Sequence, residues 1–123
     1  MHLAGYDKVM EIEIELYETT SGHCPLDDWF ESLKKLHTLA PKFLRGSTRL
    51  KFGNFGDCKH IKGASGIYEI RIHFGPGYRI YYGIEGNKIV LLLCGGDKAS
   101  QKHDIQKAMK FWNDYKELKK DNS

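Results

Sequence analysis

The chain has 123 residues, of which 41% are hydrophobic and 12% aromatic, and its formal net charge is +3. This length supports one hydrophobic core, so we expect a single domain over residues 1–123. Three widely spaced cysteines argue against a disulfide framework and a zinc site, and no run approaches the about 20 apolar residues of a membrane helix. The first residues lack the pattern of a secretory signal, so we expect a cytoplasmic location. The cysteine pattern predicts reduced thiols, and no set of carboxylates and histidines has metal-ligand spacing, so we expect no metal and no cofactor.

The charge is distributed unevenly along the chain. Residues 1–33 contain one lysine and eight acidic residues, whereas residues 34–107 contain fourteen lysines and arginines and five acidic residues. A basic surface of this kind is typical of phosphate binding, and ordinary solvated surface is the alternative interpretation. The acidic first part of the chain is suited to a basic partner.

The first predicted elements are a strand and two helices. Residues 9–17 read VMEIEIELY, an alternation that predicts a strand with one wet, acidic face. Pro25 suits the first turn of a helix whose apolar residues recur at three- and four-residue steps, and we expect this helix to end near Leu39. Pro41 opens a second helical segment that glycines at 53–56 stop, so the two form a predicted helical hairpin.

The second half of the chain is rich in strand patterns. Residues 58–62 are a short strand candidate, and the strands IYEIRIHF and YRIYYGI are joined by a Gly-Pro-Gly turn at 75–77. The apolar run IVLLLC at 89–94 predicts a strand covered on both sides. Ser100 is a suitable N-cap for a last helix that runs to about Lys119.

This order predicts an α+β fold, written β-α-α-β-β-β-α. We expect a small, mostly antiparallel four-stranded sheet with an N-terminal helical hairpin and a C-terminal helix. Side-chain alternation on the long hairpin then separates a core face from a polar face suited to a polyanion. The core face contains Tyr68, Ile70, Ile72, Phe74, Ile80 and Tyr82, and the polar face contains Glu69, Arg71, His73, Arg79 and Tyr81.

Three linked motifs carry a resemblance to a known family. They are GIYEIRI at residues 66–72, GPGYRIYY at 75–82 and LLLCGGDK at 91–98, the last followed by Gln101 and Asp104. Together they closely resemble the RelE/ParE superfamily of bacterial toxins, and within it the HigB-like addiction module killer proteins. The resemblance spans nearly the whole chain, because the order of elements also matches.

The resemblance implies the toxin of a type II toxin–antitoxin system. Such toxins are most often mRNA interferases that cut messages in the ribosomal A site, and a partner antitoxin with a helix-turn-helix domain neutralises them. Members of the ParE branch instead inhibit DNA gyrase without cleaving RNA. A relative that only binds nucleic acid is a third alternative, and the sequence does not separate these targets.

RNA cleavage requires cations near the phosphate, and two arginines and a lysine are candidates. Arg71 and Arg79 share the polar face, and guanidinium groups hold phosphate oxygens in a two-pronged grip; an ion pair with Glu69 or Glu85 is the alternative. Lys98 precedes the last helix, where bare backbone N–H groups and the helix dipole favour an anion. We expect the antitoxin to occlude the two arginines.

Proton transfer and RNA contact need further groups. His73 and His103 are the candidates for proton transfer, because histidine titrates near neutral pH. Asp97 either caps the turn or orients the neighbouring lysine. The residues predicted to contact RNA are Tyr81, Gln101, Lys59 and Lys62.

Overall fold

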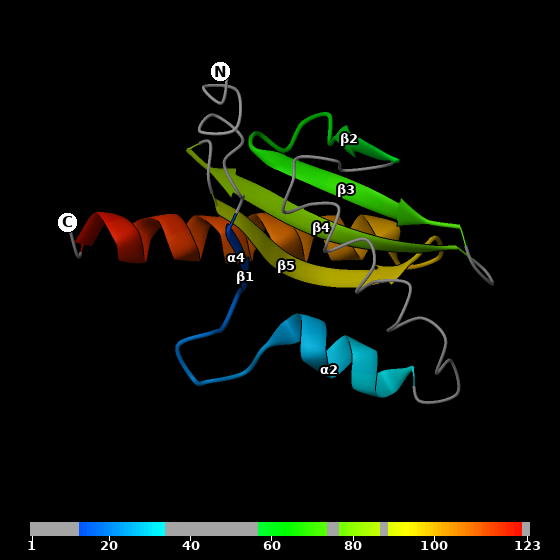
Figure 1. Ribbon diagram of the computed structural model, residues 1–123, viewed down its shortest axis with the longest axis horizontal. Coiled ribbons are helices and arrows are strands. Elements are labelled where there is room, and N and C mark those ends of the chain that lie inside the picture. Colours follow the sequence, from blue (N-terminus) through cyan, green and yellow to red (C-terminus); the bar gives the residue numbers. More distant parts are fainter. Residues whose placement is uncertain (1–12, 34–56, 74–76, 87–88, 122–123) are drawn as a thin grey trace, which may run out of the picture.

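A computed structural model describes residues 13–33, 57–73, 77–86 and 89–121. Within these ranges the chain forms one mixed sheet with a helix on each face (Figure 1). No helix in this part of the chain is long and apolar enough to cross a membrane. The elements are β1 (Glu13–Leu16), α2 (Pro25–Ser32), β2 (Cys58–His60), β3 (Ile67–Ile72), β4 (Tyr78–Glu85), β5 (Ile89–Asp97) and α4 (Gln101–Asp121).

The sheet has five described strands in the order β1-β5-β4-β3-β2. β1 pairs with β5 in parallel, and the other neighbours are antiparallel. The fold class is the predicted α+β, and the strand candidate at residues 58–62 is confirmed as β2, which pairs with the edge of β3. The predicted four-stranded sheet is wrong because it left this strand out. The second predicted helix lies outside the described residues, and α2 ends at Ser32, before the predicted Leu39.

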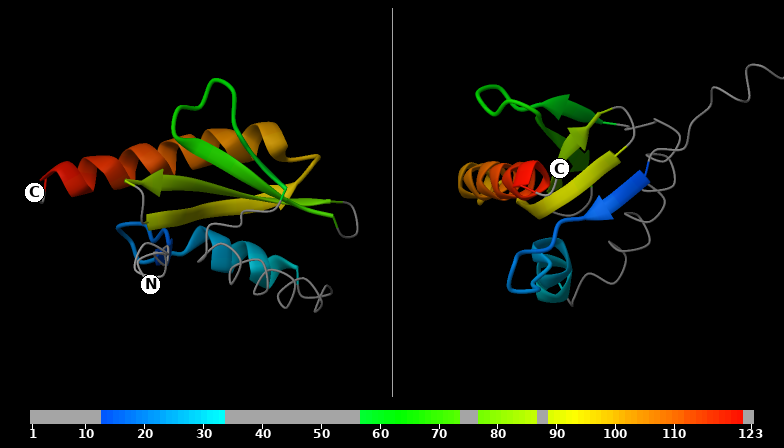
Figure 2. Two further views of the ribbon diagram at one scale, coloured as in Figure 1. Left: turned by 45° about the horizontal axis from the view of Figure 1, so that its top comes forward. Right: turned by 90° about the vertical axis from the view of Figure 1, so that its left-hand side faces the viewer.

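Both faces of the sheet are covered, as Figure 2 shows from two sides. Leu26 of α2 is buried against Ile80 and Tyr82 of β4 and Val90 and Leu92 of β5, so α2 covers this face of the sheet. β5 lies between β1 and β4, and its residues from Val90 to Gly96 are buried, in agreement with the prediction from its apolar run.

α4 covers the other face, and this overturns the prediction that one face of the hairpin is open polar surface. The alternation itself is confirmed, since Tyr68, Ile70 and Ile80 pack toward α2, whereas Tyr81 packs toward α4. Phe74 lies outside the described residues. However, Glu69 and Tyr81 are both 0% exposed. The reason is the apolar stripe of α4, which packs its residues Ile105, Ala108, Met109, Trp112 and Tyr115 over this face.

Candidate functional site

Four residues from three elements form a charged cluster under the first turn of α4. Glu69 and Arg71 belong to β3, Arg79 to β4, and Gln101 is the first residue of α4. Arg71 Nε donates to Glu69 Oε1 at 3.4 Å, and Arg79 Nε lies 3.3 Å from Glu69 Oε2. Gln101 Nε2 donates to the same Oε2 at 3.4 Å. We call Glu69, Arg71, Arg79 and Gln101 the arginine cluster.

Strand pairing explains how the arginine cluster assembles. Arg71 and Arg79 are register partners on adjacent antiparallel strands, so their side chains leave the sheet side by side on the α4 face. Glu69 precedes Arg71 by two residues and therefore lies on the same face, between the two guanidinium groups. The two sequence-predicted arginines are thus brought together, with Glu69, the alternative partner considered for them.

Burial differs strongly among the three charged side chains. The Glu69 side chain is 0% exposed, that of Arg79 is 15% exposed and that of Arg71 is 34% exposed. A buried carboxylate costs several kcal/mol unless it is paired, and two cations and one amide donor offset this cost here. The formal charge of the cluster is +1, which leaves it able to attract an anion from the solvent side.

In the connection from β5 to α4, acidic side chains accept the hydrogen bonds of Ser100. Ser100 N donates to Asp97 Oδ1 at 3.0 Å, and Ser100 Oγ donates to Asp104 Oδ2 at 2.5 Å. Asp97 therefore caps the turn, which is one of its two predicted roles. The Ser100 N–H group is thus taken by a carboxylate of the chain itself, and anion binding by the N–H groups of the first turn of α4 stays a prediction.

Lys98 is exposed and directly follows the end of β5. Asp97 and Gly96 before it are the register partners of Tyr78 and Arg79. The backbone of Lys98 thus lies at the end of the sheet where Arg79 lies.

The two predicted histidines differ in their surroundings. His73 is 75% exposed, and its Nε2 contacts Asp57 Oδ2. Arg71 N donates to the Asp57 backbone oxygen at 2.8 Å, which ties this His–Asp pair to the strand that holds Arg71. His103 is exposed on the first turn of α4 and faces away from the buried side of that helix. The contact of His73 with Asp57 was not anticipated, because no spacing rule links a histidine to an acid sixteen residues earlier.

The predicted RNA-contact residues separate into exposed and buried groups. Lys59 on β2 and Lys62 just after it are exposed, and Gln101 is half-buried against Glu69. Tyr81 is 0% exposed, so its ring cannot stack on a base in this structure, and the prediction that it contacts RNA is wrong. Burial raises the pKa of Tyr81, with Glu69 and Asp104 adding to the rise and Arg79 opposing it.

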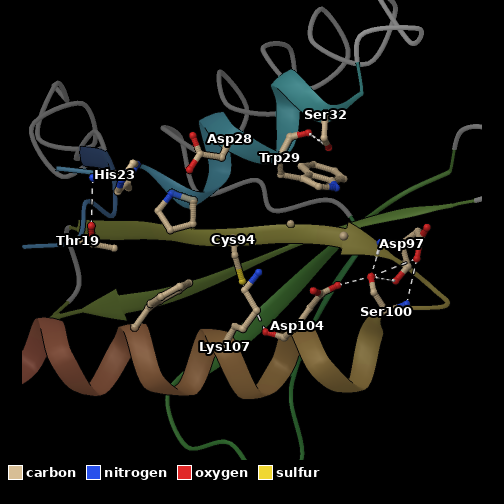
Figure 3. A pocket seen from close by; sticks show the side chains of 14 residues that line it. Thr19, His23, Asp28, Trp29, Ser32, Cys94, Asp97, Ser100, Asp104 and Lys107 are labelled. Carbon is tan, nitrogen blue, oxygen red and sulfur yellow. Dashed lines mark hydrogen bonds between the residues drawn. The ribbon is translucent and has the colours of Figure 1, made fainter. Parts of the chain in front are cut away.

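A separate cavity of about 520 Å³ lies between α2, the end of β5 and the start of α4 (Figure 3). Cys94 faces it, and burial, followed by the charge of Asp104, raises the pKa of this thiol to about 12. The side chains of Trp29 and Asp28 enter from α2, and Asp104 enters from α4. Asp97 is the one residue with a predicted role at the site among the described residues that line the cavity. No described group of His, Cys, Asp and Glu is arranged to hold a metal.

Comparisons with known proteins place these features in a family context. A family model described as "Phage derived protein Gp49-like (DUF891)" matches residues 29–113. This range includes the whole arginine cluster, Lys98 and the two histidines predicted for proton transfer, His73 and His103. A Haemophilus influenzae protein named "Uncharacterized protein" is 46% identical over 82 residues, which cover 67% of this chain and 80% of that protein.

Proposed function

Since the chain belongs to the Gp49-like phage-derived protein family, a RelE/HigB-like toxin family, we propose that it is a type II toxin that cleaves mRNA on the ribosome. The family is associated with toxin–antitoxin toxins, and it implies an antitoxin partner. In the proposal, the chain acts as one domain over residues 1–123, in the cytoplasm, without a metal, and a helix-turn-helix antitoxin inhibits it. The HigB-like subgroup is part of the same proposal.

The observation that carries the proposal is the arginine cluster. In RNA cleavage the ribose 2′-oxygen forms a bond to phosphorus while the bond from phosphorus to the 5′-oxygen breaks, and negative charge grows on the phosphoryl oxygens. Two partly exposed guanidinium groups lie side by side, in a cluster whose net charge with Glu69 is +1, and this arrangement suits the growing negative charge. Lys98 adds a third cation at the same end of the sheet.

The proton transfers of RNA cleavage require side chains that are exposed, so that bound RNA can contact them. The 2′-hydroxyl loses a proton, and the 5′-oxygen gains one as it leaves. His73 is the better placed candidate, because it is exposed, contacts Asp57, and follows Arg71 by two residues. The contact with Asp57 fixes the position of the imidazole ring beside the strand that holds Arg71. His103, exposed and two residues after Gln101, is the second candidate.

The test is expression of the chain in a bacterial host, with message ends mapped by primer extension. We expect growth arrest and new 5′ ends in messages, and we expect both to disappear with Arg71→Ala and with Arg79→Ala. Lys110→Ala is the matched control, because it removes an exposed cation on the far part of α4 and leaves the arginine cluster intact. Arrest with intact messages and stalled replication would contradict the proposal and indicate DNA gyrase as the target.

The partner is tested separately. We expect the antitoxin to cover the solvent side of Arg71 and Arg79, so a complex should protect RNA from cleavage. A structure of the complex in which both guanidinium groups stay open to solvent would contradict this mode of inhibition.

A further inference from the structure

Glu69 is a buried carboxylate at the centre of a site proposed to bind an anion. Resting on the proposed function, we infer that Glu69 is a positioning residue that aims the guanidinium groups of Arg71 and Arg79 and sets the cluster charge to match one phosphodiester. The inference stands on the three contacts of its carboxylate and on its complete burial.

A direct chemical role for Glu69 is excluded by its environment. Its side chain is 0% exposed. Oε1 accepts from Arg71, and Oε2 lies between Arg79 and Gln101. A general base must come within hydrogen-bond distance of the ribose hydroxyl, which a fully covered carboxylate cannot do. Glu69 therefore acts through the arginines.

The aiming role follows from the geometry of the pair. Like charges directly opposite on neighbouring strands repel, so Arg71 and Arg79 alone would turn their long side chains away from each other. One carboxylate between them reverses this preference. Each arginine approaches the Glu69 carboxylate with its Nε atom, at 3.4 Å for Arg71 and 3.3 Å for Arg79, and the terminal Nη atoms lie beyond it on the guanidinium group. Those atoms form the fork that grips a phosphate.

The charge role follows from counting the same groups. Two guanidinium groups and one carboxylate carry +1, and the Gln101 amide joins the cluster to α4 without adding charge. One phosphodiester carries a charge of −1, so the loaded site is neutral. Without Glu69 the site would carry +2 and would bind RNA backbone more tightly but in less defined positions.

Glu69→Gln tests this inference, because it removes the charge and keeps nearly the same shape. We expect fluorescein-labelled single-stranded RNA to bind about 3- to 10-fold tighter near 0.1 M KCl, with a log–log salt slope steeper by up to about 0.7. We expect message cleavage on ribosomes at saturating toxin to slow by about 10-fold or more. A purely structural role would weaken binding and cleavage together with the melting temperature.

Glu85→Gln is the matched control, because it makes the same change in net charge at the far end of β4, where Glu85 contacts Lys119. We expect it to leave the cleavage rate unchanged. Glu69→Asp keeps the charge and shortens the side chain, so we expect binding and salt slope like the wild type with slower cleavage. If Glu69→Gln does not fold, Glu69→Asp decides the question.

Two results would overturn the inference: a folded Glu69→Gln or Glu69→Asp protein that cleaves at the wild-type rate, or a folded Glu69→Gln protein that binds RNA no tighter than Glu85→Gln does. A wild-type protein that never cleaves messages would instead contradict the proposed function. In that case the binding measurements alone still decide whether Glu69 sets the charge of the arginine cluster.

Discussion

On one face of the sheet Trp112 of α4 lies against Gly83, and on the other Trp29 of α2 lies against Gly95. A side chain on either glycine would collide with the indole, so on both faces the close contact between helix and sheet depends on a glycine. The faces differ in what else they bury. The α4 face contains the carboxylates of Glu69 and Asp104, whereas the residues recorded as buried on the α2 face are all apolar or aromatic.

This difference shows which buried side chains are not explained by the stability of the fold. Apolar burial stabilises both helix contacts, at about 25 cal/mol for each Å² removed from water. A buried ion cluster, by contrast, is often no more stabilising than apolar residues of the same volume. The α2 face can be understood from packing alone, whereas the charges on the α4 face need another reason, which the proposed phosphate site supplies.

The largest effect should come from removing one large core side chain on each face. Trp112→Ala is expected to lower the free energy of unfolding by about 3–5 kcal/mol, and Leu26→Ala by about 2–5 kcal/mol, because both leave cavities. Urea unfolding followed by circular dichroism measures both. A loss below about 1 kcal/mol for either variant would show that its helix is not part of the cooperative core.

The glycine contacts offer a second comparison. Gly83→Ala would place a Cβ 2.5 Å from the Trp112 ring, and Gly95→Ala would place one against Trp29. Each should cost about 1–3 kcal/mol through overpacking. Combining Gly95→Ala with Trp29→Leu should recover part of the loss, and the double-mutant cycle measures this coupling. Strict additivity on either face would contradict the proposed contact there.

Removal of single arginines tests the charged face. Arg79→Ala is expected to cost about 1–2 kcal/mol, because it leaves the carboxylate of Glu69 with the more exposed Arg71 and one amide. Arg71→Ala should cost less than about 1 kcal/mol, since its side chain is 34% exposed. Thermal unfolding of both, with Lys62→Ala as a surface control, gives the ranking. The reverse order would place the structural role on Arg71.

Alternation was sufficient to predict which hairpin residues share a face. It correctly separated Arg71 and Arg79 from Ile70 and Ile80, because side chains along a strand alternate whatever surrounds them. It did not reveal that α4 lies over the polar face, since a strand pattern contains no information about the element packed on it. For that reason Tyr81 was predicted to meet RNA and is instead buried.

Contacts between residues far apart in the sequence were the other feature that the sequence did not predict. Residues 13–16 read as a strand, but nothing local to them indicates that Glu13 pairs in parallel with Ile89. Likewise, the contact of His73 with Asp57 depends on how β2 approaches β3. Glu69 was recognised as an ion-pair partner, but not as a residue shared by both arginines, because its burial depends on the tertiary fold.

The last comparison concerns one thiol from each face. Burial raises the pKa of Cys94, behind the α4 face, to about 12, and it raises the pKa of Cys24 beside α2. The folded chain keeps the Cys94 thiol neutral, whereas the unfolded chain ionises it near its ordinary pKa of about 9. Its contribution to stability is therefore complete below pH 9 and is lost as the pH rises toward 12.

We expect this loss to reach about 1 kcal/mol at pH 10. Melting temperatures of the wild type and of Cys94→Ala between pH 7 and 10 measure it, and the variant should lose stability less steeply. At pH 8 a thiol reagent should label half-buried Cys24 and Cys58 and spare Cys94 until the protein unfolds. Rapid labelling of Cys94 in the folded protein would mean that the α4 face opens to solvent, and the buried state of Glu69 on that face would then be in question.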